Sequence, residues 1–312
     1  MTIIQQIDQF IFDKCITNKQ SQHTNRYAMH KFAKFLVSIG HKGELDTAVA
    51  VRYSKHLEET VSPATRRLAI GILKQFSRWR ADNRMLPFAE RLKPPRMYDG
   101  FKRKPLTREQ LTKLVASLNT DTIINARNRA AITLMLTHAL RSIEVSRMDV
   151  ADVFDDDGVI TLRIQGKGHT EKDYITPISS VALDAINDYL VLRGDVTDES
   201  PMFINHNHRQ SEPQRWSRSE VSRTVTELIQ RLGFVKRYYT AHSLRHTVAT
   251  HLIRSGWSIY DVKIFMRHKS IKTTELYVRF GDEERIRISK PEQFFSTLFP
   301  KHTDTTHSCE LT

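Results

Sequence analysis

Apolar residues in the first third of the chain recur at the three- and four-residue spacing of α-helices, and strand-like alternation is scarce. From Ile3 to about Arg91 this pattern predicts a small domain of about four helices. The best-marked helix begins after Ser62, which can cap its first turn, and Pro63 follows where a missing N–H costs nothing. The apolar face that we predict for this helix comprises Leu68, Ile72, Phe76 and Trp79.

Helical periodicity stops at residues 92–104, where prolines, a glycine and basic residues make burial unfavourable. We predict that this segment is a basic linker. It would join a helical N-terminal domain at residues 1–91 to a second domain at residues 105–300, with a polar C-terminal tail at residues 301–312. A basic linker suits a phosphate backbone, although any solvated linker has a similar composition.

The second domain is predicted to open with a helix capped by Thr107, since Gln110 completes a capping-box pattern. A long helical pattern then runs from residue 125 to about residue 146. Two β-branched segments, 158–164 and 172–178, are joined by a short polar stretch, which predicts a β-hairpin. The expected fold class is therefore mainly α with a small antiparallel β-sheet or hairpin.

The charge balance narrows the choice of partner. The 312 residues include 48 lysines and arginines against 35 acidic residues, a formal net charge of +13. Such a chain gains affinity for nucleic acid by releasing condensed counterions, although basic proteins also bind ribosomes or membranes. The candidates for DNA-backbone contacts, for which a solvated basic surface is an equally good explanation, are Arg66, Arg67, Lys74, Arg78, Lys102, Arg103 and Lys104.

Cysteine usage and hydropathy address the cellular compartment. The two cysteines, Cys15 and Cys309, lie near opposite ends of the chain without metal-ligand spacing, so neither a disulfide framework nor a zinc ribbon is expected. The N-terminus lacks the charged region and cleavage site of a signal peptide, and no stretch approaches the ~18 apolar residues of a spanning helix. We expect a soluble, cytoplasmic protein without membrane contact.

The densest polar chemistry lies in the sequence YTAHSLRHTVATHLIRSG. If its helix begins near Ser243, then His242, Arg245 and His246 share one face at the helix N-terminus. Positive side chains at an already positive helix end cost stability unless an anion such as a phosphate binds there. A polar contact between domains is the simpler alternative explanation for this motif taken alone.

A metal site is a further alternative, because His242 and His246 have the i, i+4 spacing of a zinc-binding helix. Two features oppose it. Ser243 stands where the metalloprotease pattern requires glutamate, and Arg245 would repel a dication. We expect neither a metal nor a cofactor.

The residues from His242 to Tyr277 resemble the C-terminal signature of the tyrosine recombinase (phage integrase) family. They comprise a His-x-x-Arg-His motif followed by Thr-x-Ala-Thr, a second histidine, His268, twenty-six residues on, and Tyr277 nine residues after that. Upstream, Ala139-Leu140-Arg141 followed by Glu144 is similar to the family pattern Gly-Leu-Arg-x-x-Glu. The Gly-Lys-Gly turn around Lys167 is similar to the hairpin turn that carries the family's catalytic lysine.

This resemblance covers about residues 105 to 290, and the N-terminal region looks like the family's core-binding domain by pattern and position only. It implies a helical core-binding domain joined to a tyrosine recombinase catalytic domain, together forming a clamp around DNA. Two positions depart from the family pattern. Ala139 and Arg267 both stand where the family commonly has glycine, and Arg267 adds bulk and charge at a tight turn next to His268.

The resemblance also implies a role for each site residue. Tyr277 would attack the phosphodiester and form a 3′-phosphotyrosine, with His242 as base and Lys167 as the acid that protonates the leaving 5′-oxygen. His268 would donate a hydrogen bond to the phosphate. Arg141 and Arg245 suit phosphate recognition because each planar guanidinium donates two parallel hydrogen bonds.

These features predict a site-specific DNA recombinase that needs neither metal nor ATP. Its partners would be double-stranded target sites and, by the resemblance, three further copies in a homotetramer on two duplexes. A DNA-binding protein of the same fold without enzymatic activity is the main alternative, and a metal-dependent nuclease is disfavoured because a carboxylate cluster is missing. Integration or excision of a mobile element and plasmid or chromosome resolution all use this chemistry, and we favour a mobile-element or plasmid enzyme.

One apolar cluster near the C-terminus has no evident reason to stay in water. It either folds back on its own domain or, as C-terminal segments of this family do, docks in a neighbouring protomer. Its residues are Phe294, Phe295, Leu298 and Phe299.

Overall fold

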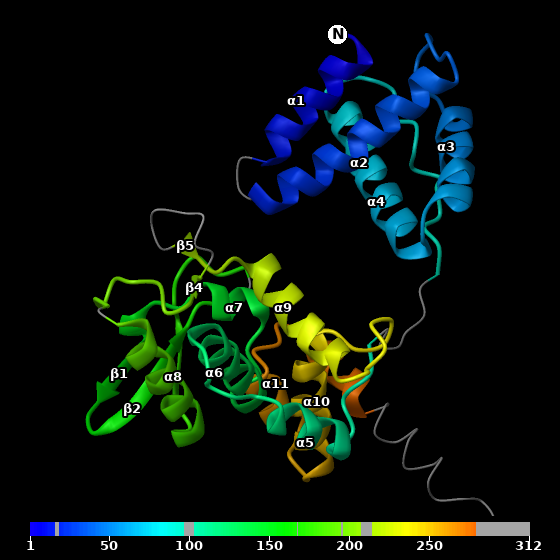
Figure 1. The fold of residues 1–312 in the computed structure, drawn as a ribbon. Helices are drawn as coiled ribbons and strands as arrows, with labels where there is room; N and C mark the ends of the chain where they lie inside the picture. The colour runs from blue at the N-terminus through cyan, green and yellow to red at the C-terminus, as the bar shows by residue number, and fades with distance from the viewer. Residues whose placement is uncertain (16–18, 97–102, 167, 195, 207–213, 279–312) are drawn as a thin grey trace, which may run out of the picture. The chain divides into compact units, whose positions relative to one another are not determined.

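The chain forms two compact units in a computed structural model, Met1–Asp99 and Gly100–Thr312 (Figure 1). The division falls inside the segment predicted as a linker. The structure describes residues 1–15, 19–96, 103–166, 168–194, 196–206 and 214–278. Several predicted features lie outside the described residues, namely Lys102, Lys167, the C-terminal apolar cluster and the polar tail.

The first unit is a bundle of helices, as the periodicity predicts. Those within the described residues are α1 (Ile3–Cys15), α2 (Lys19–Ser38), α3 (Thr47–Thr60) and α4 (Pro63–Asp82). Aromatic side chains fill its core. Phe10, Phe32 and Phe76 are fully buried, and Phe76 lies 5.3 Å from Phe10 between ring centroids. Large buried rings of this kind contribute much of the stability of a small helical unit.

Helix α4 begins where the sequence predicts, with the Ser62 side chain accepting a hydrogen bond from the Thr65 amide and with Pro63 in the first turn. Its buried face differs from the prediction at one position. Leu68 is 51% exposed, although the other three predicted residues are buried. The buried stripe is rotated toward Ala69 and Leu73, and Leu68 falls just beyond its edge.

The second unit is mainly helical with small antiparallel sheets, which confirms the predicted fold class (Figure 1). Its described helices are α5 (Arg108–Ala116), α6 (Ile123–Thr137), α7 (Ser142–Ser146), α8 (Ser180–Arg193), α9 (Arg218–Arg231), α10 (Ala241–Arg254) and α11 (Ile259–Phe265), with a 3₁₀ turn at Val150–Asp152. Residues 271–278 are also helical. Thr107 and Gln110 form the capping box predicted at the start of α5.

The predicted hairpin belongs to a three-stranded antiparallel sheet with the order β1-β2-β3. Its strands are β1 (Val153–Asp156), β2 (Val159–Ile164) and β3 (Tyr174–Pro177), and a smaller sheet pairs β4 (Ile204–Asn205) with β5 (Gln214–Arg215). Strand β1 is absent from the prediction because VFDD is short and ends in two aspartates. Its strand character comes from pairing with β2.

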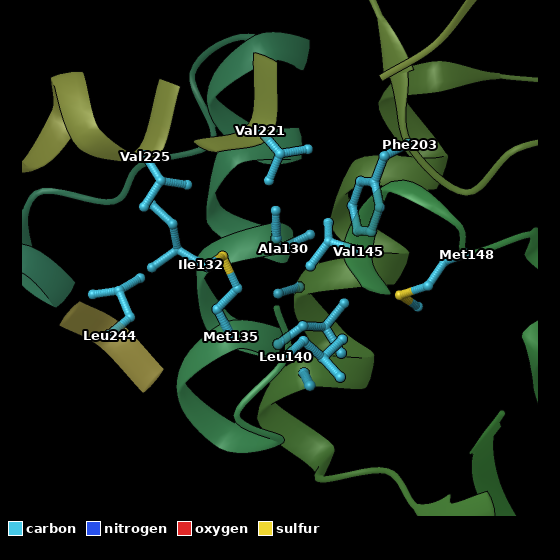
Figure 2. Close-up of a cluster of buried hydrophobic side chains, with 14 of the residues drawn as sticks. Ala130, Ile132, Met135, Leu140, Val145, Met148, Phe203, Val221, Val225 and Leu244 are labelled. Carbon is cyan, nitrogen blue, oxygen red and sulfur yellow. The ribbon is translucent and has the colours of Figure 1, made fainter. Parts of the chain in front are cut away.

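Helix α6 is the centre of the second unit, with contacts to α7, α8, α9 and α10. Figure 2 shows buried side chains of α6, α7, α9, α10 and the connecting segments packed together. Those labelled are Ala130, Ile132, Met135, Leu140, Val145, Met148, Phe203, Val221, Val225 and Leu244. Because α6 is buried on several sides, its C-terminal end has a fixed position relative to α10. Helix α10 carries His242 and Arg245, and Arg141 follows the end of α6 at the N-cap of α7.

The prediction of a single helix over residues 125–146 is wrong, because helix α6 ends at Thr137 and a separate helix, α7, begins at Ser142. Ala139 has a φ of +51°, in the left-handed region, and helical hydrogen bonding cannot continue through it. The carbonyl groups released by this break are available to other donors. The break is what places Arg141 at the N-cap of α7 instead of on a helix face.

Candidate active site

Arg141 is held by Glu144, three residues away in the chain. The Arg141 amide and Nη1 donate to the two carboxylate oxygens of Glu144 at 2.9 and 2.6 Å, and the Glu144 side chain is completely buried. Burial alone would raise the pKa of Glu144, but Arg267, Arg141 and Arg245 outweigh it, so the pKa lies below its ordinary value. Glu144 is therefore an ionised anchor for the surrounding arginines.

Arg245 comes from α10 and is only 1% exposed. Its Nη1 donates to the Ala139 carbonyl and its Nη2 to the Met266 carbonyl. The side chain thus joins the α6–α7 break to the residues that follow α11. Burial, followed by the charge of Arg141, lowers the pKa of Arg245 to about 9, which still leaves the guanidinium charged near neutral pH.

Tyr277, the predicted nucleophile, is 2% exposed and lies between two histidines. Its hydroxyl is 2.9 Å from His246 Nδ1, and its ring is stacked on His268 with centroids 6.0 Å apart and an interplanar angle of 4°. Burial raises the pKa of Tyr277 to about 12, even though Arg245 and Arg141 act in the opposite direction. The phenol is therefore neutral at physiological pH in this arrangement.

The three histidines of the site differ in environment. His268 is 9% exposed and its Nδ1 lies 2.9 Å from Thr274 Oγ1, whereas His242 is exposed in the first turn of α10. The His242 ring lies 4.4 Å from that of His246. Burial, assisted by neighbouring histidines and arginines, lowers the pKa of both His246 and His268 to about 3. Both rings are therefore neutral at pH 7.

His246 is the site residue to which the sequence prediction gave no role. The sequence placed it on a helix face that could bind an anion and weighed it as a metal ligand, yet in the structure it is a hydrogen-bonding partner of the Tyr277 hydroxyl. One signal was present in the sequence. His246 follows His242 by four residues on a helix, so both rings had to lie on one face, toward whatever His242 approaches.

The hairpin approaches the same site, although Lys167 itself lies outside the described residues. Arg147 Nη1 donates to the Gly166 carbonyl at 3.2 Å and so anchors one side of the turn. A cavity of about 660 Å³ lies between the hairpin and the segment after α11. The residues of interest on its wall are Arg141, Gly166, Gly168, His169, His268 and Lys269.

The basic residues predicted to contact DNA have varied partners in the first unit. Arg66 forms a 2.6 Å ion pair with Glu58. Arg67 and Lys74 donate to carbonyl groups of the chain that follows α4, at 3.0 Å for Arg67 and at 2.9 and 3.1 Å for Lys74. Arg78 is exposed. Arg67 and Lys74 therefore have a structural role whether or not they also contact DNA.

In the second unit, Arg103 and Lys104 pack against the loop before α10. Arg103 Nη1 donates to the carbonyls of Lys236 and Arg237, at 2.9 Å for Lys236, and the Lys104 ammonium lies 4.8 Å from the centre of the Tyr238 ring. Within the described ranges, no group of three or more histidine, cysteine or acidic side chains is arranged to hold a metal ion. None of the helices there combines the length and apolar character that crossing a membrane requires.

Comparison with known proteins assigns the chain to a family. A sequence profile of the phage integrase family matches residues 104–284, which is more than half of the chain. The chain belongs to the phage integrase family. It is accordingly a tyrosine recombinase, a member of a class of enzymes that cleave and rejoin DNA strands.

Two relatives extend the match beyond the family profile. Tyrosine recombinase XerA of Thermococcus kodakarensis is 29% identical over 281 residues, covering 89% of this chain and 92% of that protein. Tyrosine recombinase XerC of Chlamydia trachomatis is 29% identical over 221 residues, covering 69% of this chain and 67% of that protein.

Solved structures share the fold. The XerH site-specific recombinase bound to a palindromic difH substrate matches with a TM-score of 0.69 at 17% identity, covering 89% of this chain and 80% of that one. A λ integrase dimer bound to a COC′ core site matches with a TM-score of 0.67 at 14% identity, covering 89% and 95%. At these identities the likeness establishes the fold alone.

Proposed function

We propose that this phage integrase family member is a site-specific DNA recombinase whose nucleophile is Tyr277. The observation that carries the proposal is that predicted site residues from distant parts of the sequence lie together in the folded chain. Arg141, Arg245 and Tyr277 come from segments far apart in the sequence, yet they lie around one site with His268. Arg245 and Tyr277 are buried there, and the Arg141 side chain is 20% exposed. Three arginines, Arg141, Arg245 and Arg267, surround the single carboxylate of Glu144, which leaves an excess of positive charge that a DNA phosphate matches.

The reaction follows from the chemistry of a phosphodiester. Its anionic oxygens repel nucleophiles, so fixed cations must stabilise the charge that develops at phosphorus, and Arg141 and Arg245 supply it. The Tyr277 oxygen bonds to phosphorus as the bond to the 5′-oxygen breaks, which leaves a 3′-phosphotyrosine. Attack by a 5′-hydroxyl from another strand reverses these steps and rejoins DNA, and because the bond energy is conserved, ATP is not required.

Protons move at both ends of this displacement. We assign His242 as the base that takes the Tyr277 proton and Lys167 as the acid that protonates the 5′-oxygen, while His268 donates to the phosphate. His246 is unsuited to the base role in the arrangement seen here. With pKa values of about 3 for His246 and about 12 for Tyr277, the proton stays on the phenol. Cleavage then requires Tyr277 to turn from His246 toward the phosphate.

At the level of assembly, we propose a homotetramer on two DNA duplexes, with the C-terminal cluster of Phe294, Phe295, Leu298 and Phe299 docked in a neighbouring copy. The solved relatives XerH and λ integrase are described in complex with DNA, which supports duplex DNA as the partner. The biological purpose that we propose is integration or excision of a mobile element, or resolution of plasmids or chromosomes.

Covalent trapping tests the proposal directly. The protein is incubated in EDTA with a suicide substrate, a nicked recombination site whose cleaved end diffuses away. We expect a covalent protein–DNA adduct that Tyr277→Phe abolishes. Tyr260→Phe, which makes the same change at a tyrosine 68% exposed on α11, should form the adduct normally. Absence of adduct on a site that the protein demonstrably binds would contradict the enzymatic proposal, and activity that EDTA abolishes would favour a metal-dependent nuclease.

A further inference from the structure

Arg267, which precedes His268, occupies an unusual backbone conformation. Its φ is +51°, in the left-handed region that glycine adopts freely and that costs other residues about 1–2 kcal/mol. The arginine side chain is only 8% exposed. A strained backbone and a buried charge at one residue persist only where the surrounding structure enforces them.

The two terminal nitrogens of Arg267 point into the protein. Nη2 donates to the carbonyls of His138 and Ala139 at 3.0 and 3.1 Å and to Glu144 Oε2 at 3.1 Å. Nη1 donates to the Phe265 carbonyl at 3.1 Å. These acceptors include the carbonyl groups released by the break between α6 and α7. Arg267 therefore holds the turn that places Arg141.

The relation between the two arginines is reciprocal. Arg141 Nη2 donates to the carbonyls of Met266 and Arg267 at 3.5 and 3.4 Å, while Arg267 donates to the residues just before Arg141. Arg267 thus holds the left-handed turn at Ala139, which precedes Arg141. Arg141 in turn holds the left-handed turn at Arg267. Glu144 accepts from both, with Oε1 bound to Arg141 and Oε2 to Arg267.

The sharing of Glu144 between two arginines also changes the net charge of the group. An Arg141–Glu144 pair alone is neutral overall, and its field at a phosphate would be weak. Adding Arg267 to the same carboxylate leaves the group of three with a net charge of +1, and Arg245 increases it further. Because electrostatic stabilisation of phosphorus depends on the field at the site, sharing Glu144 preserves the cationic character of Arg141.

We propose that Arg267 is a positioning residue for strand cleavage, which holds the Arg141 guanidinium in place and offsets the charge of Glu144. The inference rests on the proposed function, since it assigns Arg267 a part in the same phosphate chemistry. Arg267 acts through Glu144, to which its guanidinium donates, and through the turn at Ala139 that precedes Arg141. A glycine at this position would remove the backbone strain and lose both effects.

The test measures single-turnover cleavage by Arg267→Gly and Arg267→Lys on two suicide substrates. One carries a normal scissile phosphate and the other a methylphosphonate, in which a methyl group replaces one anionic oxygen. We expect Arg267→Gly to slow cleavage of the normal substrate by about 10- to 100-fold, less than loss of a direct oxyanion donor. The slowing should shrink on the methylphosphonate, because less charge needs offsetting, and Arg267→Lys should recover part of the rate.

Arg84→Gly is the matched control, because Arg84 is an exposed arginine of the first unit with a φ of +59°. It makes the same chemical change at the same kind of backbone and should cleave both substrates as the wild type does. Thermal melting and gel-shift affinity identify a variant that fails to fold or bind, in which case Arg267→Lys decides the question.

Two results would overturn the inference while leaving the proposed function intact. One is wild-type cleavage by Arg267→Gly, and the other is an equal fractional loss on both substrates, which indicates a general structural role. A wild-type chain that forms no adduct on either substrate contradicts the proposed function, and the inference fails with it.

Discussion

The hydroxyl of Tyr277 is hydrogen-bonded away from solvent, and this is the feature of the site with the most direct energetic consequence. A buried hydroxyl without a partner costs about 1–3 kcal/mol, and His246 Nδ1 at 2.9 Å removes that cost. Burial of the phenol, which raises the pKa of Tyr277 to about 12, keeps the hydroxyl neutral in this arrangement.

A double-mutant cycle measures this bond. We expect His246→Leu to lower the free energy of unfolding by about 1–3 kcal/mol, because it removes the hydrogen bond between His246 Nδ1 and the buried Tyr277 hydroxyl. With Tyr277→Phe already in place, the same substitution should cost less, with a coupling free energy of about 0.5–1.5 kcal/mol. Urea denaturation of the four proteins gives the value. Additive effects would contradict a direct hydrogen bond in solution.

The buried histidines also predict how stability depends on pH. The pKa of His246 and His268 is about 3 in the folded chain, chiefly through burial, against an ordinary value of 6.5. Below pH 6.5 the unfolded chain therefore binds protons that the folded chain does not. This contribution to stability is complete above pH 6.5 and is lost as the pH falls from there toward 3.

Between pH 7 and pH 5 we expect the free energy of unfolding to fall, at a limiting slope of up to about 1.4 kcal/mol per pH unit for each histidine. Urea denaturation at a series of pH values provides the measurement. His268→Asn should flatten the dependence, whereas His251→Asn, at an exposed position of α10, should keep the wild-type slope. A flat wild-type profile over this window would show that the two rings are not buried in solution.

Two left-handed turns and one hairpin bring the segments of the candidate active site together. The α6–α7 break at Ala139 is invisible to periodicity, because apolar residues continue at helical spacing through it and alanine favours helix. Its cause is tertiary, since Arg245 and Arg267 both donate to the Ala139 carbonyl. The hairpin, by contrast, is evident from the β-branched segments alone, and its turn is anchored by Arg147.

The hairpin supports a prediction for the leaving-group step. If its turn supplies the acid, Lys167→Ala should slow cleavage of a normal substrate by about 10²- to 10⁴-fold. A substrate with sulfur in place of the bridging 5′-oxygen should restore the rate, because a thiolate leaves without being protonated. Arg141→Ala serves as the comparison, since it acts on the phosphate charge and should not be rescued. Equal rescue of both variants would remove Lys167 from the acid role.

For the whole molecule, a net charge of +13 implies DNA binding that weakens steeply with salt, because each neutralised phosphate releases about one counterion. We expect Arg78→Ala to reduce the slope of log K against log salt by about 0.9 if this exposed side chain meets a phosphate. Arg129→Ala, which removes an arginine paired with Asp188 at 2.9 Å, should leave the slope unchanged. Fluorescence anisotropy at several salt concentrations measures both.

Several features of the fold could be predicted from the residue pattern alone. Helix starts at Ser62 and Thr107 and the hairpin were predicted because caps and strand alternation depend on neighbouring residues in the chain. The spacing of His242, Arg245, His268 and Tyr277 carried the resemblance to the phage integrase family, and the family profile confirms the membership. Caps and strand alternation are local in the sequence, and the family motifs are recognised by residue type and spacing.

Other features depend on contacts between residues that are distant in the chain. The pairing of His246 with Tyr277 spans 31 residues, and the bond from Arg267 to Glu144 spans 123. The helix break at Ala139 and the exposure of Leu68 have the same origin. In each case the free energy comes from burial and hydrogen bonding between packed elements, which periodicity and propensity do not contain. The tertiary structure therefore decided which polar groups meet, while the sequence determined which groups were present.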